Sequence, residues 1–372
     1  MKRSEELNSK TIWSSDPHLQ VKHLVYRKYM NCWMAKILQS FPKATIVDAF
    51  SGPGIYEDGA PGSPILAAKA YLEHNSRPRF NKLDLICLEE RDDRVEELHR
   101  QFAKLPRDEN LNVMIQPPGI FAGHQERLSA LARRDNPGCP VLWIIDPFKI
   151  RDAPFELVRR CLENRRDEVI LTLFTGYMHR FCEKDGYDRT MDRCFDGEHW
   201  KSAVTVSGDG PRKAAFASAY EEGLRQLGLF TGSFGVRVSN TTEVYHLIMA
   251  THSEAGLRCW NPVGWKLDSY TGRSASADTA AADTLFADSP VVDALEAALE
   301  AHAGTERAWS QLSREAAEHR YVDRHLRQVL DRLAQRGLAM RIEPITARTP
   351  WPEGCRVRFY SPDDIRDADA YG

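Results

Sequence analysis

The sequence predicts an α/β protein with a mostly parallel sheet, followed by a small C-terminal module. Short apolar runs alternate with helical stretches between residues 45 and 252. These runs show no polar–apolar alternation, which is typical of strands buried on both faces. A Ser/Ala/Asp-rich stretch over 273–289 then precedes three helical patterns and two short strands. We therefore expect two units joined by a linker.

The elements of the first unit follow in chain order. An amphipathic helix is expected over 17–41. The expected strands are 45–50, 82–90, 112–116, 140–148, 168–174 and 244–252, with 256–260 pairing back onto the last. Alternation of strands and helices implies right-handed crossovers and parallel pairing. The final pair reads as a hairpin, which predicts an antiparallel strand at one edge.

The domain boundaries follow from these patterns. We expect a helical N-terminal segment over 1–44, an α/β domain over 45–272, a linker over 273–289 and a module over 290–362. Residues 176–215 are polar and spotted with aromatic residues. They predict an insertion after the fifth strand, partly helical and lying over the active face.

The C-terminal module has the element order of a winged helix. Three helices and a two-stranded hairpin are expected, and the third helix carries Arg320, Arg324 and Arg327 opposite its apolar face. Those arginines are the candidate nucleic-acid contacts, to DNA or RNA. Residues 291–360 hold eleven arginines against ten acidic residues, which is little charge for a nucleic-acid binder. The alternative is a packing or dimerisation module with a solvated arginine face.

Composition narrows the remaining classes. The net charge of −3 gives no global attraction to nucleic acid. Eight cysteines occur without any CxxC pair, and we expect buried free thiols in a reducing cytoplasm. No run approaches the roughly 20 apolar residues of a membrane span, so no membrane partner is expected. The His and Cys residues between 179 and 199 are too loosely spaced for zinc, and no metal site is predicted.

A glycine-rich loop follows the first strand in "IVDAFSGPGIYEDGAPGSPI", residues 46–65. Parallel sheets bind ligands at the carboxyl ends of their strands, where Asp48, Gly52 and Gly54 fall. Glycines let the backbone pass close to a ligand. The second strand ends in Glu89 and Glu90, where an acid holds ribose hydroxyls in dinucleotide sites. The spacing fits neither an ATP-type phosphate loop nor the NAD fingerprint.

The pattern Asp-x-Phe-x-Gly-x-Gly resembles the first motif of class I S-adenosylmethionine-dependent methyltransferases. The resemblance implies a Rossmann-like sheet and S-adenosylmethionine as cofactor. Asp48 would lie near the charged end of the methyl donor, and Phe50 is the motif's aromatic position. Gly52 and Gly54 would admit the methionine and ribose portions. Tyr56, just beyond, would flank the adenosine or simply fill the loop.

The fourth strand ends in "IIDPFKI". Asp146, Pro147 and Phe148 are similar to the Asp/Asn-Pro-Pro-Tyr/Phe motif of amino-methylating enzymes, in which the acid or amide accepts a hydrogen bond from the target amine. This sequence departs from the motif, because Phe148 replaces the second proline and Lys149 the usual aromatic residue. The alternative role for Asp146 is to cap a turn.

Glu89 or Glu90 would bind the ribose of the donor.

Nearly all of residues 15–360 resembles the three-Cys-motif partner proteins. The resemblance rests on "KHLVYRKY", "DAFSGPGIYEDGAPGSP", "IDPF", "YHLIMATH" and the C-terminal tail, and the long glycine loop is its most specific part. It implies a methyltransferase-like fold and association with a three-cysteine-motif, radical-type iron–sulfur protein. The N-terminal helix is also similar to that of a ribosomal RNA adenine methyltransferase. That likeness implies that Lys22 and His23 face the donor or the target base. The alternative is that both are surface charges on an amphipathic helix.

Three functions follow as competing hypotheses. The first is methyl transfer to an amine of a nucleic acid or nucleoside-like group. The second is a methyltransferase-fold scaffold or accessory subunit without activity of its own. The third is a winged-helix DNA-binding regulator. The presence of both a donor acid, Asp48, and a target acid, Asp146, favours the first.

Overall fold

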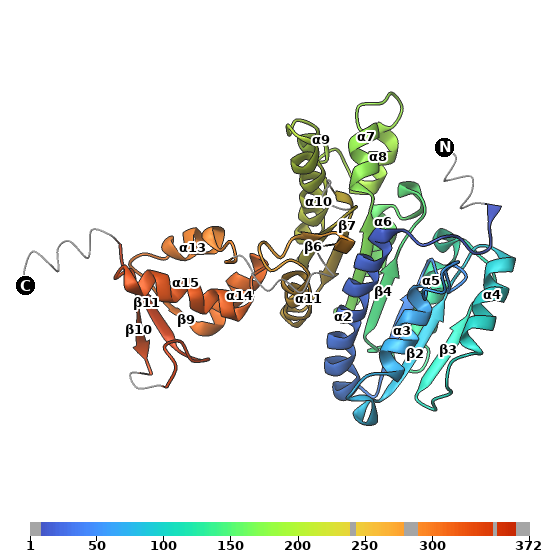
Figure 1. The fold of residues 1–372 in the computed structure, drawn as a ribbon, viewed down its shortest axis with the longest axis horizontal. Coiled ribbons are helices and arrows are strands. Elements are labelled where there is room, and N and C mark those ends of the chain that lie inside the picture. Colours follow the sequence, from blue (N-terminus) through green and yellow to red (C-terminus); the bar gives the residue numbers. More distant parts are fainter. Residues whose placement is uncertain (1–8, 239–242, 279–288, 345–347, 362–372) are drawn as a thin grey trace, which may run out of the picture.

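The computed structural model of the chain describes residues 9–238, 243–278, 289–344 and 348–361. A large sheet with helices on both faces is followed by a small helical module with its own sheet (Figure 1). Most of the expected linker, 279–288, lies outside the described residues. Among the described residues, none of the helices is both long and apolar enough to cross a membrane.

The large sheet has the strand order β3-β2-β1-β4-β5-β7-β6-β8. Its strands are β1 (Lys43–Asp48), β2 (Lys82–Cys87), β3 (Leu111–Ile115), β4 (Val141–Ile145), β5 (Asp167–Leu173), β6 (Phe230–Arg237), β7 (Glu243–Thr251) and β8 (Ser274–Ala275). Strands β1 to β5 run parallel, whereas β7 is antiparallel to both β5 and β6. The mixed, mostly parallel sheet expected from the apolar runs is confirmed.

The expected hairpin is wrong in two respects. Residues 256–260 belong to helix α11 (Glu254–Leu267), and the hairpin partner of β7 is the preceding strand β6. Strand β7 therefore lies inside the sheet rather than at its edge. Glycines hid β6 from sequence patterns: a Cβ at Gly232 would lie 2.5 Å from the ring of Trp260 on α11, so packing of the helix requires that glycine.

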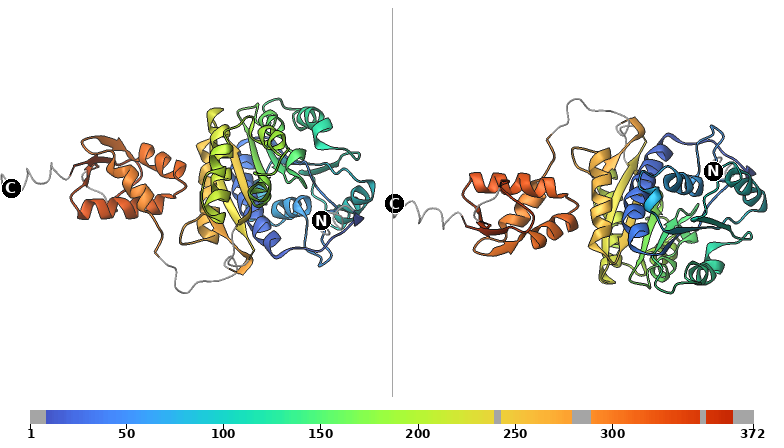
Figure 2. Two further views of the ribbon diagram at one scale, coloured as in Figure 1. Left: turned by 90° about the horizontal axis from the view of Figure 1, so that it is seen from above. Right: turned by 90° about the horizontal axis from the view of Figure 1, so that it is seen from below.

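Two layers of helices cover the sheet (Figure 2). One face packs against α2 (Pro17–Ser40), α3 (Ser63–Leu72), α4 (Asp92–Phe102) and α11. The other face packs against α5 (Phe121–Ala132), α6 (Phe155–Arg160), α7 (Thr175–Phe181), α8 (Asp188–Phe195), α9 (Lys201–Val204) and α10 (Asp209–Gln226). Two 3-10 turns, η1 (Arg77–Arg79) and η2 (Ile150–Asp152), complete the connections.

The expected insertion over 176–215 is mostly helical and forms part of the core. Helices α7, α8 and α9 and the start of α10 fall in it, and Met191, Phe195 and Trp200 are buried against the sheet. Its polar and aromatic composition predicted a segment lying over the active face rather than a layer of helices packed on the sheet. The large aromatic side chains are instead the ones that fill the core on this face.

The C-terminal module consists of α13 (Asp293–Glu300), β9 (Glu306–Ala308), α14 (Trp309–Glu318), α15 (Asp323–Gln335), β10 (Ala339–Glu343) and β11 (Arg356–Phe359). Its antiparallel sheet has the order β10-β11-β9, and strand β9 was not expected. Hydrogen bonds dock the module on α11: Asn261 donates to the carbonyl of Ala317 at 2.8 Å, and Trp265 to that of Arg320 at 2.8 Å.

The expectation that three arginines share one helix face is wrong for Arg320. Helix α15 begins only at Asp323, and Arg320 lies in the preceding turn with a φ of 69°. Its side chain pairs with Glu221, a fully buried residue of α10. Arg324 is exposed, whereas Arg327 lies 4.7 Å from the centroid of the Trp309 ring. Because Arg320 pairs with the large domain, it does not share the helix face that was predicted to contact a nucleic-acid groove.

The expectation of free thiols is wrong for two of the eight cysteines. Cys32 on α2 forms a disulfide with Cys259 on α11, 227 positions apart. The other six are free and buried. Spacing could not reveal the pair, because only the packing of both helices on the same face of the sheet brings the two sulfurs together.

Candidate functional site

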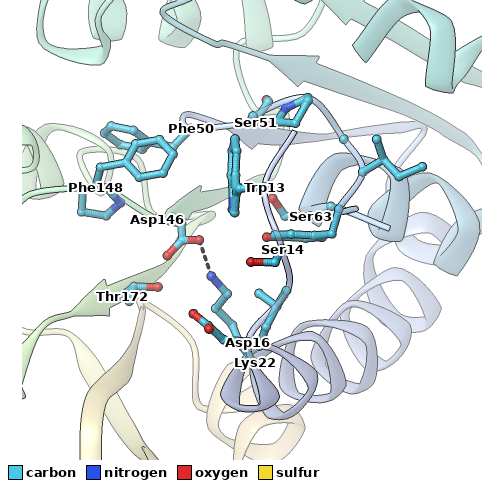
Figure 3. Close-up of a pocket in the computed structure, with 18 of the residues that line it drawn as sticks. Trp13, Ser14, Asp16, Lys22, Phe50, Ser51, Ser63, Asp146, Phe148 and Thr172 are labelled. Atoms are coloured by element: carbon cyan, nitrogen blue, oxygen red, sulfur yellow. Dashed lines mark hydrogen bonds and ion pairs between the residues drawn. The ribbon is translucent and has the colours of Figure 1, made fainter. Parts of the chain in front are cut away.

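A cavity of about 220 Å³ opens at the carboxyl ends of the central strands. Its walls come from the segment before α2, the start of α2, the loop after β1, and the ends of β4 and β5 (Figure 3). Eight of the predicted site residues line it: Lys22, Phe50, Gly52, Gly54, Tyr56, Asp146, Pro147 and Phe148. Of the predicted catalytic and donor-binding residues, four do not line it: His23, Asp48, Glu89 and Glu90.

The glycine loop folds back tightly on itself. Gly52 and Gly54 have φ values of 60° and 75°, in the left-handed region that favours glycine. A Cβ at Gly54 would lie 2.7 Å from Leu98, and one at Gly62 would lie 2.9 Å from the backbone of Gly54. Two passes of the loop, at Gly54 and Gly62, can therefore touch only because Gly62 lacks a side chain, and Gly54 packs against Leu98 for the same reason.

Asp48 lies behind the loop and supports it. The residue is fully buried, and its Oδ1 accepts a hydrogen bond from the Phe50 amide at 3.2 Å. Burial raises the pKa of Asp48 to about 7, although the Phe50 amide and the nearby Ser63 hydroxyl favour the ionised form. Oδ2 is also buried and makes no hydrogen bond of ordinary geometry with the described residues. A cation entering the cavity would favour the ionised carboxylate.

The two acids after β2 have different roles. Glu89 is buried, accepting hydrogen bonds from the amides of Gly52 at 3.0 Å and Arg91 at 3.1 Å, with the Arg94 guanidinium 3.7 Å away. Burial raises the pKa of Glu89, and these partners oppose that shift. Glu90 is exposed. Glu89 therefore holds the glycine loop, and Glu90 takes no part in the cavity.

The cavity contains an ion pair that joins distant parts of the chain. Lys22 on α2 approaches Asp146, just after β4, with Nζ 2.5 Å from Oδ2 (Figure 3). The side chains are only 10% and 20% exposed. A pair this shielded keeps more of its Coulomb attraction than a surface pair. Lys22 was predicted to face the donor or the target, and in the structure it faces Asp146.

His23 does not line the cavity but packs against a residue that does. Its ring lies 5.8 Å from that of Tyr56, in a tilted arrangement. Burial, helped by the neighbouring charge of Lys22, lowers the pKa of His23 to about 3. The imidazole is therefore neutral at physiological pH, and its low pKa makes it a poor general base.

Several cavity residues were missed from the sequence. Trp13 comes from the segment before α2, Thr172 from β5 and Tyr245 from β7. A polar residue inside the apolar run "VILTLF" was a usable signal for Thr172. Trp13 had none, because it lies outside every regular element. Among the described residues no group of three or more His, Cys, Asp or Glu could hold a metal ion.

The fold and the site together define a class. The strand order β3-β2-β1-β4-β5-β7-β6 with β7 antiparallel, and a glycine loop directly after β1, are those of a class I methyltransferase-like, Rossmann-like domain. No family model matches the chain, and no curated protein matches it. The fold assignment therefore rests on the strand order itself.

Several solved structures are similar to the chain, although distantly. Trm1 from Pyrococcus horikoshii, in complex with S-adenosyl-L-methionine, aligns at 14% identity and a TM-score of 0.41 over 69% of this chain and 60% of that one. Cofactor-bound Rv0187 from MTB aligns at 13% identity and a TM-score of 0.32, over 64% of this chain and 90% of that one. A DUF574 family protein from Streptomyces avermitilis aligns at 13% identity and a TM-score of 0.33, over 61% of this chain and 82% of that one. The chain thus spans 60% of the Trm1 chain, and likenesses this distant say nothing about a substrate.

Proposed function

We propose that the protein is an S-adenosylmethionine-dependent methyltransferase whose acceptor is an amine of a nucleic acid or nucleoside-like group. One observation carries the proposal. The glycine loop after β1 and the Lys22–Asp146 pair, from separate parts of the chain, line a single cavity at the carboxyl edge of the sheet. That edge is where open α/β sheets bind their ligands.

The residues around the loop fit the donor. Gly52 and Gly54 let the loop turn tightly beside the cavity that they line, and Asp48 supplies a buried carboxyl group behind them. Glu89 comes just after the second strand, the sequence position of the acid that holds ribose hydroxyls in dinucleotide sites. When bound, the donor would supply an activated methyl group on a sulfonium. The protein's contribution is then mainly orientation and electrostatics.

The acceptor side is built around Asp146. Its carboxylate can accept a hydrogen bond from an N–H group, and Lys22 holds that carboxylate in place at 2.5 Å. Phe148 follows two residues later and is 42% exposed. An exposed aromatic ring beside the acid suits a flat heterocycle that carries the amine. These features support an amine on an aromatic base over an isolated alkyl amine.

Further parts of the proposal rest on the family resemblance. We take the C-terminal module to be a winged helix, consistent with its three helices and antiparallel sheet. Arg324 and Arg327 remain its candidate nucleic-acid contacts. A three-cysteine-motif iron–sulfur protein remains the proposed partner, and the cytoplasm the proposed location. The competing function is that of a methyltransferase-fold scaffold without activity.

Calorimetric titration tests the proposal. We would titrate the full chain with S-adenosylmethionine and S-adenosylhomocysteine, beside an Asp48→Ala variant whose fold is checked by circular dichroism. Micromolar binding by the wild type, weakened in the variant, is the expected result. Failure of the folded wild type to bind at millimolar ligand would overturn the proposal and favour the scaffold.

A further inference from the structure

The segment before α2 lies across the proposed donor site. Residues 10–16, which we call the N-terminal strap, run from α2 toward α4 (Figure 1). The carbonyl of Trp13 accepts a hydrogen bond from the amide of Glu57 at 3.1 Å, and Lys10 pairs with Glu57 at 3.1 Å. Thr11 donates to Asp93, and Ser15 to Asp58. The strap is thus tied to the glycine loop on one side and to α4 on the other.

Trp13 fills a slot beside the first glycine of the loop. A Cβ at Gly52 would lie 3.2 Å from the Trp13 ring, so the indole packs directly against the main chain there. The guanidinium carbon of Arg94 lies 4.6 Å from the ring centroid, and Phe148 lies 5.8 Å away edge-on. Tyr56 makes a second edge contact at 5.9 Å. Glycine, a cation and aromatic edges together form a slot for a flat π system.

Residues of the strap line the cavity at the proposed donor site and limit its size. The remaining cavity measures about 220 Å³, whereas pockets for molecules of drug size are roughly 300–1,000 Å³. Glu89, the candidate ribose acid, already has its two oxygens on the amides of Gly52 and Arg91 and lies beside Arg94. Arg94 in turn donates to the carbonyl of Lys10 in the strap, at 3.1 Å. The strap therefore lies against Arg94, the neighbour of the acid proposed to hold the ribose.

The geometry points to an autoinhibitory role for the strap: Trp13 occupies the slot that receives the purine ring of the donor, and the strap withdraws when the donor binds. This inference rests on the proposed function. The Lys10–Glu57 ion pair that helps to hold the strap allows it to withdraw. The two side chains are 42% and 45% exposed, and exposed ion pairs contribute little free energy. The ligand class is a purine nucleoside.

Removing Trp13 tests the inference. We would titrate S-adenosylhomocysteine into the wild type, Trp13→Ala, and a variant with Lys10→Ala and Thr11→Val, which loosens the strap but leaves the slot intact. If the slot is open in about a tenth of the wild-type molecules, Trp13→Ala lowers the dissociation constant about tenfold. The loosened variant shifts it in the same direction by less. Tyr270→Ala, an exposed aromatic change outside the site, is the control and leaves the constant unchanged.

Hydrogen exchange provides the second readout. The Glu57 amide, bonded to the Trp13 carbonyl, is expected to exchange faster in the presence of S-adenosylhomocysteine. Weaker or unchanged binding by Trp13→Ala, with the wild type still binding, would overturn the inference alone, since Trp13 would then be a wall of the site or irrelevant to it. Absence of binding by every variant would instead overturn the proposed function, and the strap's role with it.

Discussion

The two ends of the large sheet make an instructive comparison. Helix α2 contacts both: Lys22 pairs with Asp146 at the carboxyl end, and Tyr29 donates to Glu168 at the amino end. Each end has a cavity of similar size, about 220 Å³ and about 260 Å³. Each also has a buried acid whose pKa burial raises to about 7, Asp48 at one end and Glu168 at the other.

The surroundings of the acids differ. Both oxygens of Glu168 are hydrogen-bonded by side chains from packed elements, Tyr29 and Thr251. Asp48 stands behind a loop of main chain, and one of its oxygens makes no hydrogen bond of ordinary geometry with the described residues. A buried acid with a raised pKa is therefore insufficient to mark a site. A tight glycine loop that lines a cavity in front of the buried acid is the more specific sign.

The largest expected effect compares one glycine from each end. A Cβ at Gly54 would lie 2.7 Å from Leu98, and one at Gly256 would lie 2.7 Å from Thr251, so the two overlaps are alike. Both alanine variants should lose roughly 1–3 kcal/mol of stability through overpacking, and Gly54→Ala should lose more because its φ of 75° also disfavours a Cβ. Only Gly54→Ala should lose donor binding, at least about tenfold, because it displaces the loop. Calorimetry with S-adenosylhomocysteine measures this, and equal loss in both variants would erase the distinction.

The pH dependence of stability gives the next effect. The folded-state pKa of Glu168 is about 7, above its usual 4.5, so the folded state binds a proton that the unfolded state has released between these values. Stability therefore falls as pH rises from about 4.5 to 7, by up to about 3 kcal/mol from this group. Glu168→Gln should flatten the fall and leave donor binding unchanged. Urea unfolding at pH 5 and pH 8 measures it, and an identical slope in the variant would contradict the shift.

The smallest expected effect compares two lysines of α2. Lys22→Met leaves the shielded Asp146 carboxylate without its cation and should cost about 2 kcal/mol, below the full penalty for a completely buried pair. Lys36 makes a long hydrogen bond of 3.4 Å to the Ala255 carbonyl, and Lys36→Met should cost less than about 1 kcal/mol. Urea denaturation at pH 7 distinguishes them. Equal costs would indicate that the Lys22–Asp146 pair is as weak as a surface contact.

The sequence by itself determined the features that depend on nearby residues. The parallel strands were predictable because continuous short apolar runs are typical of strands that are buried on both faces. The loop of Gly52 and Gly54 was predictable because glycine adopts left-handed backbone angles far more readily than other residues, and Asp146 because it follows a strand at the ligand-binding edge. Strand β6 was missed because Gly232, which makes room for Trp260, weakens the strand pattern.

Only the tertiary structure decided which distant groups meet. Lys22 and Asp146 are 124 positions apart, and Cys32 and Cys259 are 227 apart. Trp13 reaches the glycine loop from outside any regular element, and Arg320 leaves its expected helix to neutralise Glu221. Periodicity records which face of an element is buried, but it does not record which element covers that face. The partners of the site were therefore fixed by the packing of helices on the sheet, a property of the whole fold.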